Sequence, residues 1–61
     1  MKGWPFVWIV NRNAQDWGKL AIITSVLPPE RKGERVIQPY GVGILGERFS
    51  YRYESDELQL A

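Results

Sequence analysis

The sequence contains no cysteine and no histidine. Disulfide bonds, which stabilise many small domains, are therefore excluded within this chain. The usual ligands of a zinc site are missing as well, and so are Ser–His–Asp and Cys–His catalytic arrangements. We therefore predict a protein that is not an enzyme, binds no metal ion or cofactor, and acts on no small-molecule substrate. The absence of cysteine fits a reducing compartment, and we expect a cytoplasmic protein.

Long apolar runs and a strong excess of one charge are also missing. The apolar run over residues 4–10 is too short to cross a bilayer, and no small-residue cleavage site follows it, so we expect neither a membrane segment nor a signal peptide. Eight basic and seven acidic residues give a net charge of +1. Nucleic-acid-binding domains usually carry a larger positive excess, which lowers the expectation of that function without excluding it.

A β-hairpin is the clearest feature that the sequence does contain, over residues 40–53. Gly46 and Glu47 fit the Gly-X pair of a two-residue type II′ turn, with strand-forming residues on both sides. The implied register pairs Leu45 with Arg48, Ile44 with Phe49, Val42 with Tyr51, and Tyr40 with Tyr53. The last three pairs share one face, which we expect to be core, because side chains alternate along a strand.

The rest of the 61 residues predicts a single small all-β domain, residues 1–61. Pro28 and Pro29 indicate a loop over residues 27–33, and Pro39 must lie at an edge or a bend. Gly41 and Gly43 indicate strong curvature or the close approach of another group. Ser55 is the expected N-cap of a 3₁₀ turn over residues 55–57. We expect strands at residues 5–10, 19–26, 34–45, 48–53 and 58–60.

Five short strands with tight connections suggest a small, strongly bent barrel, which protects most strand edges. The sequence resembles the layout of Src homology 3-like small barrels in the order of four features. Gly18 precedes a strand, residues 38–42 belong to the next long strand, Gly46 lies in a tight turn, and residues 53–58 lead through a 3₁₀ turn into the last strand. The resemblance implies a five-stranded barrel with one 3₁₀ turn before its last strand. The signature motifs of the signalling domains are absent, so the resemblance does not imply binding of proline-rich peptides.

The three tryptophans suggest a non-enzymatic interaction module. The first predicted strand is apolar on both faces, with Trp4, Phe6, Trp8 and Val10 on one and Val7 and Ile9 on the other. A small sheet cannot easily bury both faces by itself. Trp4, Trp8 and Trp17 are therefore our candidate residues for binding a protein partner or a second copy. Alternatively, Trp4 or Trp8 covers the space above Gly41 and Gly43.

The alternative function is a nucleic-acid-binding accessory barrel. Its candidate residues lie in the predicted loop and on the outer hairpin face: Arg31, Lys32, Arg35, Arg48 and Arg52. These side chains would meet phosphates, while Trp17 or Tyr53 stacks on bases. The competing interpretation is a solvated face that Glu34, Glu47 and Glu54 partly neutralise. For Glu54, Asp56 and Glu57 we predict capping and solvation rather than a metal site.

Overall fold

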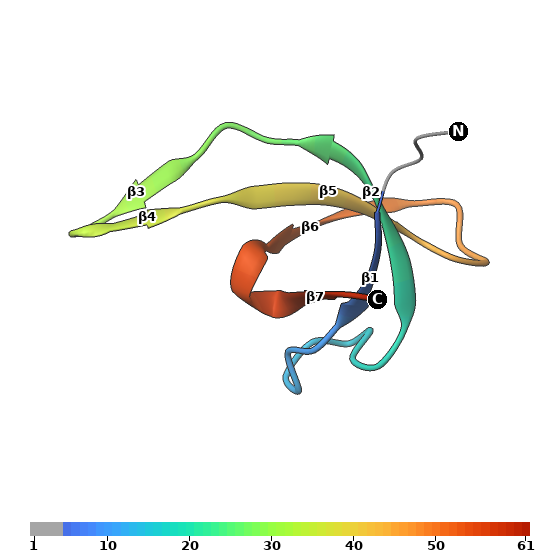
Figure 1. Ribbon diagram of the computed structural model, residues 1–61. Coiled ribbons are helices and arrows are strands. Elements are labelled where there is room, and N and C mark those ends of the chain that lie inside the picture. The colour runs from blue at the N-terminus through green and yellow to red at the C-terminus, as the bar shows by residue number, and fades with distance from the viewer. Residues whose placement is uncertain (1–4) are drawn as a thin grey trace.

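The structure, a computed structural model, describes residues 5–61 as an all-β chain with one 3₁₀ turn (Figure 1). This confirms the predicted all-β class and the 3₁₀ turn before the last strand. The elements are β1 (Phe6–Ile9), β2 (Leu20–Val26), β3 (Glu30–Lys32), β4 (Arg35–Ile37), β5 (Pro39–Ile44), β6 (Ser50–Glu54), η1 (Ser55–Glu57) and β7 (Leu58–Leu60).

Five of the strands form one antiparallel sheet in the order β6-β5-β2-β1-β7, and β3 pairs with β4 in a separate ribbon. Figure 1 shows the sheet curling strongly, and the ribbon projecting away from it. η1 connects β6 to β7, which are the two ends of the strand order. The curl encloses one face of the sheet and leaves the other on the outside.

The enclosed face carries the hydrophobic core. Its members are Val7, Ile9, Ala21, Ile23, Val42 and Ile44. They come from alternate positions of β1, β2 and β5, as the period of two along a strand requires. Val7 pairs with Ala21, which in turn pairs with Ile44 on β5. The predicted alternation of the first two strands is therefore confirmed for the residues that the structure describes.

The predicted hairpin is correct in register and wrong in its turn. Val42 pairs with Tyr51, and Tyr40 with Tyr53, as expected. However, the N–H of Glu47 donates to the carbonyl of Ile44 (3.0 Å), which closes the turn one residue early. Gly46 then occupies the third position with φ +90°, which fits a type II turn and not type II′.

The two outermost predicted pairs are consequently not formed. β5 ends at Ile44, β6 begins at Ser50, and residues 45–49 form a loop, so neither the Leu45–Arg48 nor the Ile44–Phe49 pair exists. Ile44 pairs only on the other edge of β5, with Ala21 of β2. Phe49 is not a core residue, because 70% of it is exposed.

The segment predicted as a loop and one long strand contains a hairpin of its own. Lys32 pairs with Arg35 across the two-residue turn Gly33–Glu34. Gly33 has φ +62° at the first central position, which is the arrangement of a type II′ turn. Gln38 separates β4 from β5, and Pro39 is the first residue of β5, where proline is tolerated. The predicted uninterrupted strand is therefore wrong, because it is broken directly before Pro39.

The close approach expected at Gly41 is present. A β-carbon at Gly41 would collide with the hydroxyl group of Ser25, its partner on β2 beside an irregularity in the pairing.

Gly41→Ala should therefore destabilise the protein by about 1 kcal/mol, the low end of overpacking effects. In a Ser25→Ala background the same change should be neutral or stabilising, because it lowers the entropy of the unfolded chain. Urea unfolding of the four proteins measures this coupling; simple additivity would contradict it.

Candidate protein-interaction surface

The outside of β1 and β2 carries an unusual set of apolar side chains. Phe6 pairs with Ile22, and Trp8 pairs with Leu20, so these four side chains lie together on one face. We call this set, Phe6, Trp8, Leu20 and Ile22, the β1–β2 outer face. Phe6 is 48% and Trp8 42% exposed, while Leu20 and Ile22 are partly exposed. Their immediate neighbours, Val7, Ile9, Ala21 and Ile23, are buried on the opposite face.

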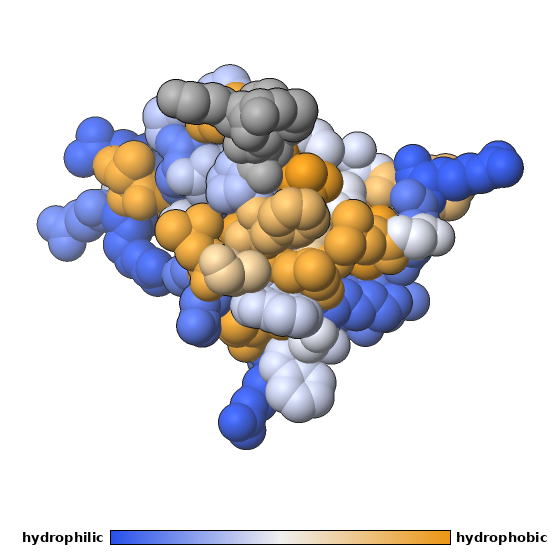
Figure 2. All heavy atoms as spheres, turned by 45° about the vertical axis from the view of Figure 1, so that its right-hand side comes forward, coloured by the Kyte–Doolittle hydropathy of each residue, from blue (hydrophilic) through white to orange (hydrophobic). Residues whose placement is uncertain are grey.

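Part of the exposed hydrophobic surface is gathered on one side of the molecule. Figure 2 shows a continuous hydrophobic area in the middle of one side, with charged side chains projecting around its margin. Gly43, opposite Ile22 on β5, contributes no side chain that would cover the β1–β2 outer face. Contiguous exposed apolar patches on small soluble domains are typical of interaction sites. The sequence predicted an apolar surplus on the first strand, and pairing with β2 enlarges it.

The three predicted tryptophans have different outcomes. Trp8 belongs to the β1–β2 outer face, whereas Trp4 lies outside the described residues. Trp17 is 55% exposed in the loop between β1 and β2, where its backbone N–H donates to the carbonyl of Ala14 (3.1 Å). The alternative that Trp8 covers Gly41 and Gly43 is wrong, because, among the described residues, the side chains nearest to these glycines belong to Ser25, Thr24 and Ile22.

A polar network fixes the β1–β2 loop to β6. The carboxylate of Asp16, which is only 6% exposed, accepts hydrogen bonds from Lys19 Nζ (3.1 Å) and the hydroxyl group of Tyr53 (3.3 Å). Lys19 also binds Glu47 (3.2 Å), which in turn accepts a hydrogen bond from the Tyr51 hydroxyl (2.9 Å). Sequence reasoning missed this network, which holds the loop beside the β1–β2 outer face in place.

The network moves pKa values away from neutrality. Hydrogen bonds to Asp16 and Glu47 raise the pKa of Lys19. Burial, followed by the charge of Asp16, raises the pKa of Tyr53, and the hydrogen bond to Glu47 raises that of Tyr51. A general acid or base works best with a pKa near the operating pH, so these shifts do not equip the three groups for such catalysis.

The predicted basic residues do not form a free cationic patch. Arg52 pairs with Glu30 (2.9 Å) and Glu54 (3.8 Å), and Lys32 approaches the same Glu54 (3.6 Å). Arg35 lies 4.0 Å from Asp56. These pairs draw the ribbon toward β6 and η1, and they neutralise three of the five candidates.

The remaining two basic candidates are Arg31 and Arg48. Arg31 donates to the carbonyl of Gly33 (3.4 Å) within its own hairpin, and Arg48 is exposed in the loop between β5 and β6. Of the three predicted neutralising residues, Glu54 pairs with members of the set, while Glu47 pairs with Lys19 instead.

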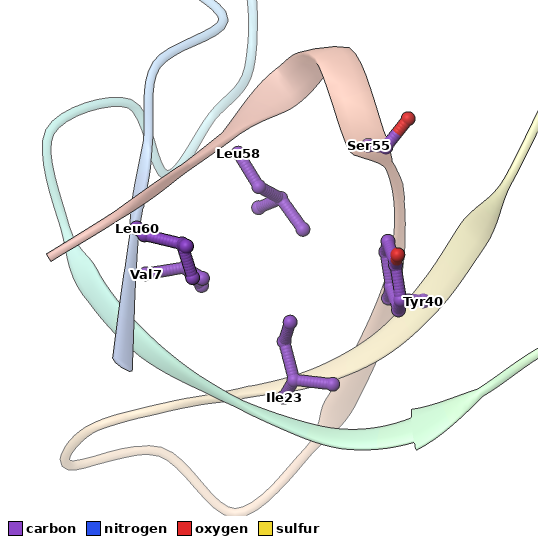
Figure 3. A pocket seen from close by; sticks show the side chains of 6 residues that line it. All are labelled: Val7, Ile23, Tyr40, Ser55, Leu58 and Leu60. Carbon is purple, nitrogen blue, oxygen red and sulfur yellow. The ribbon is translucent and has the colours of Figure 1, made fainter. Parts of the chain in front are cut away.

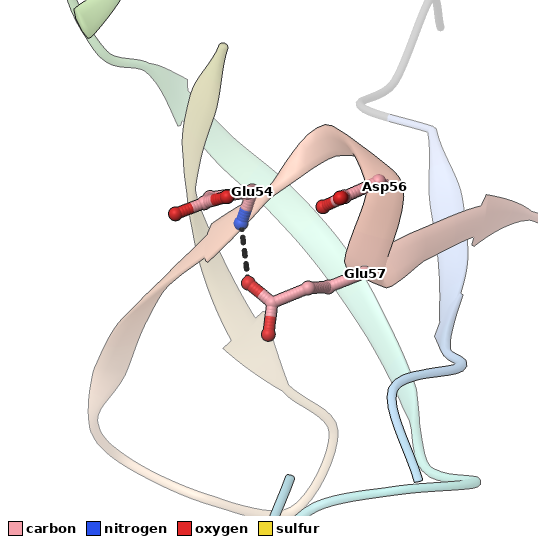
Figure 4. Close-up of side chains that lie close together, drawn as sticks. All are labelled: Glu54, Asp56 and Glu57. Atoms are coloured by element: carbon pink, nitrogen blue, oxygen red, sulfur yellow. Dashed lines mark hydrogen bonds between the residues drawn. The ribbon is translucent and has the colours of Figure 1, made fainter. Parts of the chain in front are cut away.

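The acidic cluster around η1 has a structural role. Carboxylate oxygens of Glu54, Asp56 and Glu57 lie within 4.8 Å of one another (Figure 4). Glu57 accepts hydrogen bonds from the backbone N–H of Glu54 (2.9 Å) and from the side chain of Asn11 (2.8 Å). Glu54 and Glu57 form a capping box, so the N-cap is Glu54 and not the predicted Ser55. The predicted capping function is thus confirmed for Glu54 and Glu57.

Comparisons with protein-family models, with curated proteins and with solved structures found no match to this chain. Within residues 5–61, no helix has the length and apolar character that crossing a membrane requires.

Proposed function

We propose that the protein is a non-enzymatic interaction module whose β1–β2 outer face binds a protein partner or a second copy of the chain. The observation that supports this most is the cross-strand pairing of Phe6 with Ile22 and of Trp8 with Leu20, which leaves two aromatic side chains nearly half exposed. Exposed aromatic side chains supply large contact areas and are common among the residues that dominate binding energy.

For the fold, we propose a Src homology 3-like small barrel. The strand order β7-β1-β2-β5-β6, with η1 between β6 and β7, supports this layout, and so does the strong curl of the sheet. In this proposal the β3–β4 ribbon is an extension of the connection between the second and third barrel strands.

The test uses light scattering over a range of protein concentrations, together with affinity capture from native cell extract. We expect either a mass that rises with concentration or a captured protein. Phe6→Ala and Trp8→Ala should each weaken the association about tenfold or more, as removal of a binding hot spot does. Phe49→Ala is the matched control, because Phe49 is 70% exposed, lies in the loop between β5 and β6, and is not a member of the β1–β2 outer face. It should retain the association.

A protein that stays monomeric and captures nothing sensitive to Phe6→Ala or Trp8→Ala would overturn the proposal. The nucleic-acid alternative has less support, because Lys32, Arg35 and Arg52 already have carboxylate partners. It predicts that nuclease treatment of the extract removes the captured material, and that binding to oligonucleotides weakens steeply with salt.

A further inference from the structure

An apolar cavity opens on the enclosed side of the sheet, away from the β1–β2 outer face. Its volume is about 210 Å³, and its lining residues are Val7, Ile23, Tyr40, Ser55, Leu58 and Leu60. Figure 3 shows Val7, Ile23, Leu58 and Leu60 directed toward its centre, with Tyr40 and Ser55 at one side. An apolar protein cavity of about 150 Å³ binds benzene, so this cavity is large enough for a ring-sized apolar group.

The edge of β7 lies beside this cavity and has free backbone groups. Val10 donates to the carbonyl of Glu57 (2.8 Å), and Ala61 donates to that of Phe6 (2.9 Å). In an antiparallel ladder, hydrogen-bonded pairs alternate with pairs whose N–H and C=O groups point outward. Leu58, opposite Ile9, and Leu60, opposite Val7, belong to the pairs whose backbone N–H and C=O groups point away from β1. The N–H of Leu58 binds Ser55, which leaves the carbonyl of Leu58 and both backbone groups of Leu60 on the free edge.

The two edges of the sheet differ in their protection. At β6, Arg52 pairs with Glu30 and Glu54 pairs with Lys32, both on the ribbon. Charged side chains on an edge strand discourage the addition of another strand. The sequence of β7, Leu-Gln-Leu, has no charge, no proline and no bulge. Within residues 5–61 no strand pairs with its outer edge. Apart from its length of three residues, β7 has none of the features that protect an edge, and such an edge is a template for another strand.

We propose that β7 and this cavity together bind an extended peptide segment of a partner protein. The segment adds a strand beside Leu58–Leu60 and places one apolar, ring-sized side chain in the cavity. Alternate residues of an added strand share the face of Leu58 and Leu60, and these two side chains line the cavity. Backbone pairing then supplies general affinity, while the cavity selects the side chain. This site is separate from the β1–β2 outer face and does not depend on it.

The test is a titration of the full chain with two blocked synthetic peptides, acetyl-Lys-Thr-Phe-Thr-Lys-amide and its analogue with alanine in place of phenylalanine, followed by NMR. The phenylalanine peptide should shift the amide signal of Leu60 and the methyl signals of Val7, Ile23 and Leu58. The alanine peptide should bind about tenfold more weakly or worse, because it leaves the cavity empty. The signals of Phe6 and Trp8 should stay unchanged.

Two variants separate the backbone contact from the cavity. Leu60→Pro removes the outward N–H without breaking a hydrogen bond to β1, and it should abolish binding of the phenylalanine peptide. Leu60→Ala keeps that donor and trims the cavity wall, so it should reduce the preference for phenylalanine over alanine. Gln59→Ala, on the same strand but the opposite face, should bind normally. Equal binding of both peptides, shifts confined to Phe6 and Trp8, or no shifts at all would overturn the proposal.

Discussion

Replacing Ile9 by alanine is expected to lower the free energy of unfolding by about 3 kcal/mol, within the usual range for a buried isoleucine. Ile9 has no exposed surface and belongs to the core cluster, between Val7 on its own strand and Leu58 across the pairing with β7. A domain this small has few other sources of stability, and it contains no disulfide bond. We therefore expect the melting temperature, followed by circular dichroism, to fall by more than about 10 °C.

The matched control for this experiment is Ile22→Ala. It removes the same atoms from the neighbouring strand, but Ile22 faces outward beside Phe6 and is partly exposed. We expect a loss of about 1–2 kcal/mol, clearly smaller than that of Ile9→Ala, since fewer buried contacts disappear. Ile22→Ala should instead weaken the association proposed for the β1–β2 outer face. A loss of stability equal to that of Ile9→Ala would show that the two faces of the sheet have been assigned the wrong way round.

The alternation behind this pair of variants was predictable from the sequence. A strand directs successive side chains to opposite faces, so the separation of Val7 and Ile9 from Phe6 and Trp8 depends only on recognising a strand. Which strand lies beside it was not predictable from that pattern. Pairing with β2 brings Ile22 next to Phe6, and this juxtaposition turns one apolar strand into a candidate surface.

The turns show why local patterns fail. The tripeptide Gly-Glu-Arg occurs twice, at residues 33–35 and 46–48. The first copy forms a two-residue hairpin turn, because Lys32 and Arg35 pair with each other and nothing else competes for them in the ladder. In the second copy the backbone N–H of Leu45 donates to the carbonyl of Leu20 on β2, and the Glu47 side chain binds Lys19 and Tyr51. Tertiary contacts therefore choose the turn type, although the local sequence is the same.

The polar network was missed for a related reason. Asp16 and Lys19 are three residues apart and suggest at most a local pair, whereas Tyr53 and Glu47 reach them from a distant hairpin. No periodicity in the sequence indicates that contact. The carboxylate partners of Lys32, Arg35 and Arg52 were unpredictable for the same reason, because they depend on the position of the unpredicted ribbon against β6 and η1.

Asp16→Ala is expected to cost about 2 kcal/mol, the range for hydrogen bonds to a buried charged group. The change removes the acceptor of both Lys19 and Tyr53, and it releases the β1–β2 loop from β6. Tyr53→Phe removes one of these bonds and should cost about half as much. Urea unfolding near neutral pH measures both losses. A cost for Asp16→Ala no larger than that of Tyr53→Phe would mean that Lys19 contributes nothing to the network.

Alkaline pH gives a second readout of the same variant. Tyr53 and Lys19 have higher pKa values in the folded state than in the unfolded state, where they are about 10 and 10.5. Their contribution to stability is therefore complete below the unfolded-state pKa, and it disappears as the pH rises through the folded-state pKa. Wild-type stability should therefore fall above about pH 10. Asp16 raises the pKa of both Tyr53 and Lys19. In Asp16→Ala the fall should be shallower, whereas a purely steric effect of the substitution would lower stability equally at every pH.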